Sequence, residues 1–321
     1  MGSGSEMPVA GRDYPGTWQA FEAWFADEDA CREFLVAVRW PEGFLCPNCG
    51  SCEAWETARG LFMCSSCSRQ TSVTAGTIFH RTRTPLRTWF AAMWMMCAQK
   101  NGVSATALQQ LLGFRSYETA WAWPHKLRRA MVRPDRDRLG GPGVSVELDE
   151  TNIGGRARAG APRYANKARV VIAVERREPK GLGRVRMAVI DTDNTMGDIE
   201  AFATEVIEPG TILWTDGARH YHRLGELTAA THEPIDLVHS DDPAHTVLPA
   251  VHRVAALLKR WLEGTFHDGQ SVTHLDYYLD EYTFRFNRRT SRSRGLLFYR
   301  LTQQALRTDP HPLNDLKAHS Q

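Results

Sequence analysis

Two Cys-x-x-Cys pairs near the N-terminus have the spacing of metal ligands. Fourteen residues separate the pairs, which is enough for a short hairpin that brings them together. Four thiolates arranged in this way form a closed tetrahedral zinc site, and a site without an open position serves structure rather than catalysis. The predicted ligands of this structural Zn²⁺ are Cys46, Cys49, Cys64 and Cys67.

Two aspartates follow apolar segments that predict β-strands. Asp149 comes after the alternating apolar residues of 144–148, and Asp216 comes after the apolar residues of 212–214. Acidic side chains at strand ends can hold a hard divalent cation through their carboxylate oxygens. Together the two aspartates predict a cation site at one edge of a sheet.

A predicted helix over 249–262 contributes two further polar side chains. Its apolar positions form a buried face, and His252 and Lys259 share a neighbouring stripe with a spacing of seven residues. Thirty-five residues separate Asp216 from His252. The ammonium of Lys259 would be a suitable point-charge partner for a phosphate near such a site.

The elements that must position these residues change in type along the chain. Residues 85–129 have helical periodicity, whereas the segments beyond 143 have the pattern of strands alternating with helices. The expected strands are 144–149, 168–175, 185–191, 211–215 and 235–239, and the expected helices are 196–207, 249–262 and 274–286. This order predicts a mixed α/β sheet with helices on both faces.

Between the cysteines and these strands, the sequence has the outline of a helix-turn-helix. Ser104 caps a short helix that ends at Gly113, and Ser116 starts a second helix that ends in basic residues. We expect Pro124 to kink or end this second helix. The pattern predicts DNA binding through Lys126, Arg128 and Arg129, and an ordinary helical hairpin is the alternative.

The net charge of +2 conceals an uneven distribution. Residues 1–68 carry 4 Lys and Arg against 10 Asp and Glu, whereas residues 81–138 carry 11 against 3. Clusters of basic residues recur within 156–169 and 285–294. Positive regions of this kind are typical of proteins that bind nucleic acid, although a solvated surface is the alternative. The predicted phosphate contacts in these clusters are Arg156, Arg158, Arg288 and Arg289.

The composition is that of a globular protein, and the sequence has the pattern of neither a membrane-spanning nor a secreted protein. An apolar fraction of 42% with 24% charged residues is that of a globular protein with enough length for two or three domains. The longest apolar run, Trp89–Ala98, is far shorter than the roughly 20 residues of a membrane helix. The N-terminal residues also lack the pattern of a secretion signal. We therefore expect a cytoplasmic protein without a membrane partner.

The combination of motifs resembles a known family. A Cys₄ motif, a helical basic segment, Val146-Glu-Leu-Asp149-Glu150-Thr, Thr215-Asp216-Gly and the His252/Lys259 pair resemble the bacterial insertion-sequence transposases that carry a zinc ribbon and an ISXO2-like DDE domain of ribonuclease H fold. The ending 278–289 resembles the closing motif of the same group. The expected domains are an N-terminal lead with helices at 1–44, a zinc ribbon at 45–72, a helix-turn-helix segment at 80–133, a linker at 134–143, a ribonuclease H-like catalytic domain at 144–300 and a C-terminal tail at 301–321.

The resemblance implies DNA transposition with two catalytic Mg²⁺ or Mn²⁺ ions. By it, Asp149 and Asp216 are the first two catalytic carboxylates, Lys259 is the downstream basic residue that contacts DNA, and His252 stands where many relatives carry glutamate. The partners would be double-stranded DNA at the transposon ends and at the target, bound by a homodimer or larger assembly. Such a protein works in the bacterial cytoplasm in association with the nucleoid.

His252 leaves three interpretations open, because Mg²⁺ prefers oxygen ligands and imidazole suits ions such as Mn²⁺. His252 could bind the metal or orient water on it, Glu150 or Glu263 could supply the missing carboxylate, or the enzyme could be inactive. The alternative functions are accordingly a catalytically inactive DNA-binding regulator and, from another class, a nuclease that cleaves RNA–DNA hybrids.

Overall fold

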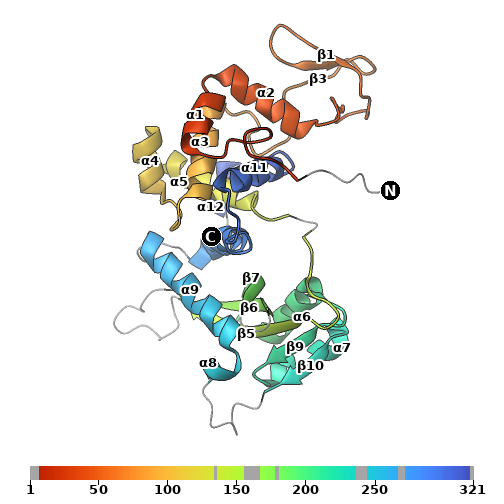
Figure 1. Cartoon of the computed structure of the whole chain (residues 1–321), viewed down its shortest axis with the longest axis vertical. Helices are drawn as coiled ribbons and strands as arrows, with labels where there is room; N and C mark the ends of the chain where they lie inside the picture. The colour runs from red at the N-terminus through yellow and green to blue at the C-terminus, as the bar shows by residue number, and fades with distance from the viewer. Residues whose placement is uncertain are drawn as a thin grey trace. The chain divides into compact units, whose positions relative to one another are not determined.

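A computed structural model describes residues 7–133, 136–154, 167–177, 181–235, 244–266 and 272–318. The chain divides into two compact units (Figure 1). Unit one comprises Met1–Arg133 and Thr290–His319, and unit two comprises Pro134–Arg289. The chain therefore leaves unit one at the start of the expected linker, builds unit two, and returns to unit one.

Unit one combines helices with a small sheet. Its elements are α1 (Trp18–Trp24), α2 (Glu28–Arg39), β1 (Ala54–Glu56), β2 (Phe62–Cys64), β3 (Gln70–Thr71), α3 (Leu86–Ala98), α4 (Ala105–Leu112), α5 (Tyr117–Arg129), α11 (Arg294–Ala305) and α12 (Leu313–Ala318). The strands form an antiparallel sheet in the order β1-β2-β3.

The expected C-terminal tail is instead part of the core of unit one. Helix α11 packs against α3, and its residues Leu301 and Ala305 from the expected tail are fully buried. The rings of Phe298 and Phe90 lie 5.6 Å apart in an edge-to-face arrangement, so residues 294–300 also belong to unit one rather than to the expected catalytic domain. Phe298 is fully buried, as are Phe21 and Phe25 of the N-terminal helical region. The prediction of a tail was wrong. The sequence of α11 has only a weak amphipathic pattern, and its apolar residues are buried only because the helix packs against α3.

Helices α4 and α5 have the predicted local geometry. The hydroxyl of Ser104 accepts a hydrogen bond from the Ala107 amide (3.2 Å), Gly113 has a φ of 69°, and the Ser116 hydroxyl accepts from the Glu118 amide (3.2 Å). Pro124 does not end α5, which continues to Arg129. Local caps therefore define both helices, as the sequence predicts.

Unit two contains a five-stranded sheet in the order β10-β9-β5-β6-β7. Strands β10, β9 and β5 are parallel, and β6 and β7 continue the sheet in antiparallel fashion. The bounds are β5 (Ser145–Ile153), β6 (Ala168–Arg176), β7 (Leu182–Ile190), β9 (Ile212–Thr215) and β10 (Thr231–Pro234). This mixed α/β sheet confirms the predicted fold class.

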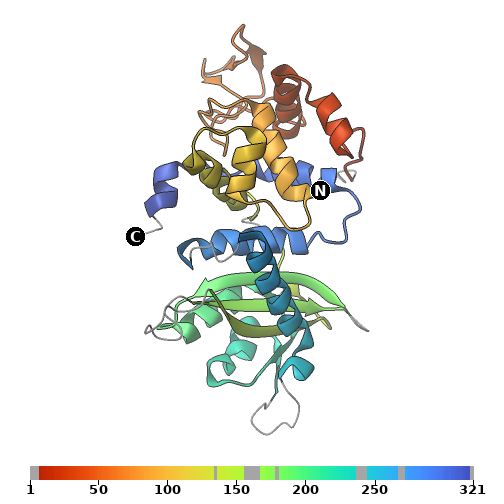
Figure 2. The same ribbon diagram turned by 90° about the vertical axis from the view of Figure 1, so that its left-hand side faces the viewer.

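Helices cover both faces of the sheet, since side chains alternate between the faces along each strand. One face packs against α9 (Pro249–Phe266) and α10 (Leu275–Phe286), and the other packs against α6 (Thr195–Val206), the 3₁₀ helix η1 (Arg219–Tyr221) and α7 (Leu224–Thr228). A short helix, α8 (Ala244–Val247), precedes α9, and η2 (Val272–His274) precedes α10. Figure 2 shows α9 lying along its face of the sheet.

Three details differ from the sequence-based expectations. Strand β5 continues to Ile153, so Asp149 lies within the strand rather than at its end. The last strand of the sheet is at Thr231–Pro234, and residues 236–239 of the expected strand lie outside the described residues. Part of the expected linker forms β4 (Leu139–Gly140), which pairs with β8 (Ile207–Glu208).

Gly140 shows why this part of the linker is ordered. Its φ is 87°, and a Cβ at this position would lie 2.1 Å from Oγ1 of Thr211. The neighbouring Gly141 amide donates to the same hydroxyl (2.9 Å). Only glycine permits this close approach, and the adjacent Leu139 is fully buried in the core of unit two.

Candidate functional site

The two aspartates lie at the same level of neighbouring parallel strands. Strands β5 and β9 pair Ser145 with Ile212 and Glu147 with Trp214. Continued by two residues, this register sets Asp149 of β5 opposite Asp216, which directly follows β9. The sheet therefore brings together two carboxylates that are 67 positions apart in the sequence.

Helix α9 brings the imidazole of His252 to the same site. Its Nε2 lies 3.6 Å from Oδ2 of Asp149, and the two side chains retain 34% and 18% of their exposure. Both side chains are thus partly shielded from solvent. The three groups come from segments far apart in sequence: Asp149 from β5, Asp216 from the residue after β9 and His252 from α9.

The electrostatics of this site favour an added positive charge. Burial, together with the negative charges of Glu150 and Asp216, raises the pKa of Asp149 to about 7, although the Glu150 amide donates to its carboxylate (2.8 Å). Burial and Asp216 also raise the pKa of Glu150. Carboxylates that repel one another in a low-dielectric environment are stabilised by a bound cation.

Glu150 directly follows Asp149 on β5, and the two carboxyl groups also interact with each other. Its carboxylate accepts a hydrogen bond from the hydroxyl of the buried Tyr221, and Nε2 of His220 lies 3.0 Å from its other oxygen. Burial lowers the pKa of His220, so this imidazole is predominantly neutral at pH 7. Glu150 is thus held by residues of η1.

The other carboxylate considered as a replacement for the missing glutamate is remote from Asp149. Glu263 is exposed and lies eleven residues after His252, which corresponds to about 16 Å along a helix. The negative charge of Glu263 instead acts to raise the pKa of Lys259, which lies one turn earlier on α9. Among the candidates on α9, only His252 is in contact with Asp149.

Lys259 lies two turns after His252 on α9, as its spacing predicts. Its side chain is half-buried, and burial, together with the nearby positive charge of Lys167, lowers its pKa. Two ammonium groups that act on each other in this way form a positive region suited to an anionic ligand such as a phosphate.

The remaining predicted DNA contacts have different environments. Arg129 is exposed and Lys126 is half-buried, but Arg128 retains only 2% of its exposure. Arg128 was therefore a wrong prediction, because a side chain in the core of unit one does not reach a phosphate. The basic sequence pattern alone did not show that the side chain of Arg128 is buried whereas that of Arg129 is exposed. Two further predicted contacts, Arg156 and Arg158, lie outside the described residues.

The predicted contacts Arg288 and Arg289 lie at the edge of the sheet in unit two. The guanidinium of Arg289 donates to the carbonyl of Gly183 (3.1 Å) and also to that of Leu182. It stacks on the Phe286 ring, and Arg288 lies similarly over Phe284. Arg289 thus covers the open edge of β7, a role that cannot be read from its charge.

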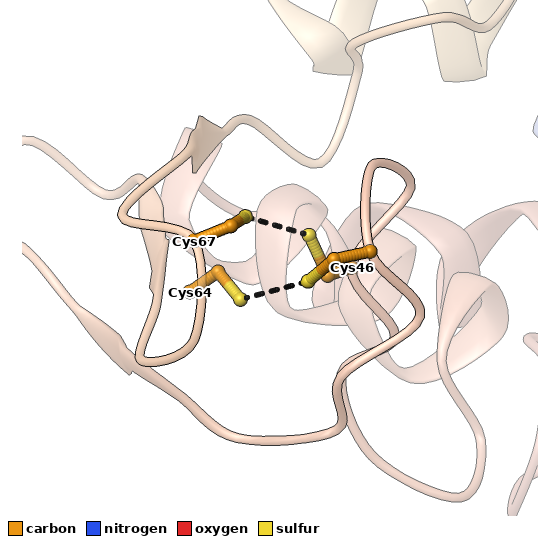
Figure 3. Close-up of side chains that lie close together, drawn as sticks. Cys46, Cys64 and Cys67 are labelled. Carbon is orange, nitrogen blue, oxygen red and sulfur yellow. Dashed lines mark hydrogen bonds between the residues drawn. The ribbon is translucent and has the colours of Figure 1, made fainter.

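The four predicted cysteines gather in unit one (Figure 3). The Sγ atoms of Cys46 and Cys67 are 3.7 Å apart, and those of Cys49 and Cys64 are 3.6 Å apart. Sulfurs bound tetrahedrally to zinc at about 2.3 Å lie about 3.8 Å from one another. The cluster therefore fits a Zn²⁺ ion. Among the described residues, it is the only group of three or more His, Cys, Asp or Glu side chains whose ligand atoms all lie within 4.8 Å.

The local backbone of the cluster favours thiolates. The backbone amides of Cys67 and Ser66 donate to the Cys64 sulfur and lower its pKa to about 6. The amides of Cys49 and Asn48 similarly lower the pKa of Cys46. The thiolate is the form of cysteine that binds zinc. Each Cys-x-x-Cys turn therefore favours zinc binding by lowering the pKa of its first cysteine.

Comparison with known families finds a match within each unit. Residues 138–287 match the ISXO2-like transposase domain, and residues 26–70 match the transposase zinc-ribbon domain. The chain thus matches two transposase domain models over separate stretches, which confirms the resemblance seen in its motifs. The zinc-ribbon match begins within the N-terminal helices, earlier than the expected boundary at residue 45.

A relative with a described origin supports this assignment. The chain is 27% identical over 290 residues to an uncharacterized protein in transposable element ISH50 of Halobacterium salinarum. The alignment covers 81% of this chain and 91% of the relative. In the part of the chain that the structure describes, no helix combines the length and apolar character needed to cross a membrane.

Sequence reasoning missed three side chains around the acidic site. Tyr221 and His220 hold Glu150, and the fully buried Glu147 contacts the start of α9. The sequence pattern could have indicated Glu147, because side chains of β5 alternate between the two faces of the sheet and Glu147 shares a face with Asp149. Charged residues at inward positions of a strand are rare unless they have a partner.

Proposed function

We propose that the protein is a DDE-type transposase that cleaves DNA at the ends of an insertion sequence and joins the resulting 3′-hydroxyl to target DNA. The observation that supports this proposal is the contact of His252 with Asp149, together with a strand register that sets Asp216 beside Asp149. The family match to an ISXO2-like transposase domain supports the same reaction class.

Asp149 and Asp216 would hold two divalent cations, Mg²⁺ or Mn²⁺. When bound, such ions activate the attacking hydroxyl and offset the negative charge on the phosphate and on the leaving oxygen. Burial, together with neighbouring negative charges, raises the pKa of Asp149, which fits this assignment because a bound cation stabilises the ionised carboxylate. His252 offers an imidazole nitrogen beside Asp149 as a further ligand or as a partner for ordered water.

The other residues of this chain would bind and orient the substrate. Lys259 would contact the phosphate backbone near the cleaved bond, with Lys167 adding to the positive field. The water or the 3′-hydroxyl attacks the phosphorus directly, so no covalent bond to the protein forms. The zinc ribbon and the α4–α5 pair would bind the terminal inverted repeats, with Arg129 and Lys126 contacting phosphates.

Concerted cutting of two ends requires two active sites, so we propose that the protein acts as a homodimer or larger assembly on double-stranded DNA. The ribbon would carry a structural Zn²⁺ ion, as its cysteine geometry supports.

An assay with purified protein tests the proposal. The substrate is a duplex carrying the DNA that flanks the coding sequence in its source genome, incubated with Mg²⁺ or Mn²⁺. We expect end cleavage and strand transfer that fall by about 10³-fold in Asp149→Asn while DNA binding persists. The matched control is Asp193→Asn, an identical change at an exposed aspartate after β7, which should retain activity.

A catalytically inactive DNA-binding regulator is the second candidate function, favoured by the histidine at position 252. It predicts specific binding of the same duplex without cleavage under either ion, and no difference between the wild type and Asp149→Asn. Cleavage of an RNA–DNA hybrid, but not of the duplex, would instead indicate a hybrid-specific nuclease.

A further inference from the structure

Glu147 connects the strand that carries Asp149 to the helix that carries His252. Its side chain is fully buried, and Oε2 accepts hydrogen bonds from the backbone amides of Ala250 (2.7 Å) and Val251 (2.9 Å). These amides belong to the first turn of α9. A carboxylate of β5 thus forms the N-terminal cap of a helix that begins 102 positions later in the sequence.

The chemistry of the helix start suits this contact. Amides of the first turn have no acceptor within the helix, and Pro249, the first residue of α9, has no amide hydrogen. Ala250 and Val251 are the next two donors along the chain. The positive end of the helix dipole also favours a carboxylate at this position. Glu147 therefore satisfies donors that would otherwise be buried without a partner.

The guanidinium of Arg176 lies near the second carboxylate oxygen of Glu147. The Nε atom of Arg176 lies 3.6 Å from Oε1 of Glu147, and its guanidinium lies over the ring of Trp214, 6.0 Å from the centroid. Trp214 is the β9 partner of Glu147 in the sheet register. Groups from the two neighbouring strands thus surround the carboxylate and hold it toward α9.

The position of Glu147 relates it directly to the active site. Glu147 and Asp149 are two residues apart on β5 and so face the same side of the sheet, about 7 Å apart along the strand. Val251, which Glu147 caps, directly precedes His252. We propose that Glu147 is a positioning residue that fixes the start of α9 and thereby holds His252 against Asp149. The catalytic part of this inference rests on the proposed function, whereas the docking of α9 does not.

Hydrogen exchange of the full-length protein tests the docking. In Glu147→Met, which keeps the size but removes the acceptor, we expect faster exchange in residues 249–256 and unchanged protection of β6 and β7. Glu147→Gln keeps an acceptor oxygen and should restore most of the protection. Should the methionine variant fail to fold, Glu147→Asp, which is too short to reach both amides, should show the same local effect.

A matched control separates docking from general destabilisation. Glu175 is another buried carboxylate of the same sheet, but it contacts Arg184 and Gly140 rather than α9. Glu175→Met should not accelerate exchange of residues 249–256 relative to the rest of unit two. Unchanged exchange at 249–256 in Glu147→Met, or the same local effect in Glu175→Met, would overturn the inference.

A double-variant comparison tests whether Glu147 acts through His252. We expect DNA cleavage by Glu147→Met to fall about 10- to 100-fold and that of Glu147→Gln to fall less. In a His252→Ala background, Glu147→Met should cause no further loss, because the residue it positions is gone. Independent losses that multiply would show a general structural role and refute the inference while leaving the transposase assignment intact. Absence of cleavage by the wild type would refute the proposed function, and hydrogen exchange would still decide the docking of α9.

Discussion

The cysteine cluster and the acidic site differ in how their groups are brought together. The cysteines come from two turns within 22 consecutive residues, and their sulfurs already lie at the separations of a tetrahedral zinc site. The acidic site takes its groups from β5, β9 and α9, which only the folded sheet assembles. Local geometry defines the first site, and long-range register defines the second.

The two sites also differ in what surrounds them. The ribbon has a small apolar cluster of Phe44, Cys46 and Cys64, with Trp40 and Phe62 packed against it. The acidic site belongs to unit two, which has a large apolar core on each face of its sheet. We therefore expect metal binding to determine the fold of the ribbon, but only the charge balance and activity of the acidic site.

Loss of a zinc ligand should have the largest effect and tests this contrast directly. Cys64→Ser is expected to lose zinc and to unfold the ribbon, because structural zinc sites contribute on the order of 10 kcal/mol to folding. Metal analysis and hydrogen exchange would show zinc loss and rapid exchange over 46–71 with unit two still protected. Cys52→Ser is the matched control, since this exposed cysteine lies outside the cluster. A ribbon that stays protected without zinc would contradict the contrast.

Substitution of His252 should have a smaller effect, confined to catalysis. His252→Ala is expected to lower strand transfer by about 10²-fold while DNA binding and hydrogen exchange of unit two stay unchanged. His252→Glu should retain part of the activity with Mg²⁺, because a carboxylate is the ligand that this ion prefers. Wild-type activity of His252→Ala, measured with both ions, would remove this residue from the site.

Glu175 provides a comparison with Asp149, because it is a buried carboxylate with a cation. Burial alone would raise the pKa of Glu175, but hydrogen bonds from Arg184 and from the Gly140 amide lower it overall. Its stabilising contribution is present above the pKa of an unfolded glutamate, about 4.5, and is lost as the pH falls through the lower folded value.

Glu175→Gln should accordingly destabilise unit two by about 1–3 kcal/mol at pH 7, with a smaller difference at pH 3. Urea unfolding at both pH values measures this change. A difference from the wild type that grows toward low pH would contradict the assigned ion pair.

The smallest effects should separate two exposed arginines. Arg129→Ala is expected to weaken binding to duplex DNA and to lower the salt dependence of binding by about one ion. Arg289→Ala should instead lower thermal stability by about 1 kcal/mol, because it loses hydrogen bonds at the edge of β7. Fluorescence anisotropy over a range of salt concentrations measures DNA binding, and thermal unfolding measures stability. Weaker DNA binding by Arg289→Ala with lower stability of Arg129→Ala would contradict these roles.

Several local features could be predicted because a few neighbouring residues determine them. The zinc-ligand spacing, the caps Ser104 and Ser116, and most strand positions of unit two follow from short patterns. The direction of each charged side chain could not be predicted in this way. Arg128 and Arg129 are adjacent and chemically identical, yet one is buried and the other exposed.

By itself, the sequence determined which chemical groups are available and the turns that prepare the cysteines, since those interactions span only a few residues. The tertiary structure decided that Asp149 meets Asp216 and His252, that Glu147 caps α9, and that the C-terminal segment completes unit one. These outcomes depend on sheet register and on the matching of apolar faces across 60 to 200 residues. Such pairings are cooperative, because each element buries its apolar face only when its partners are in place.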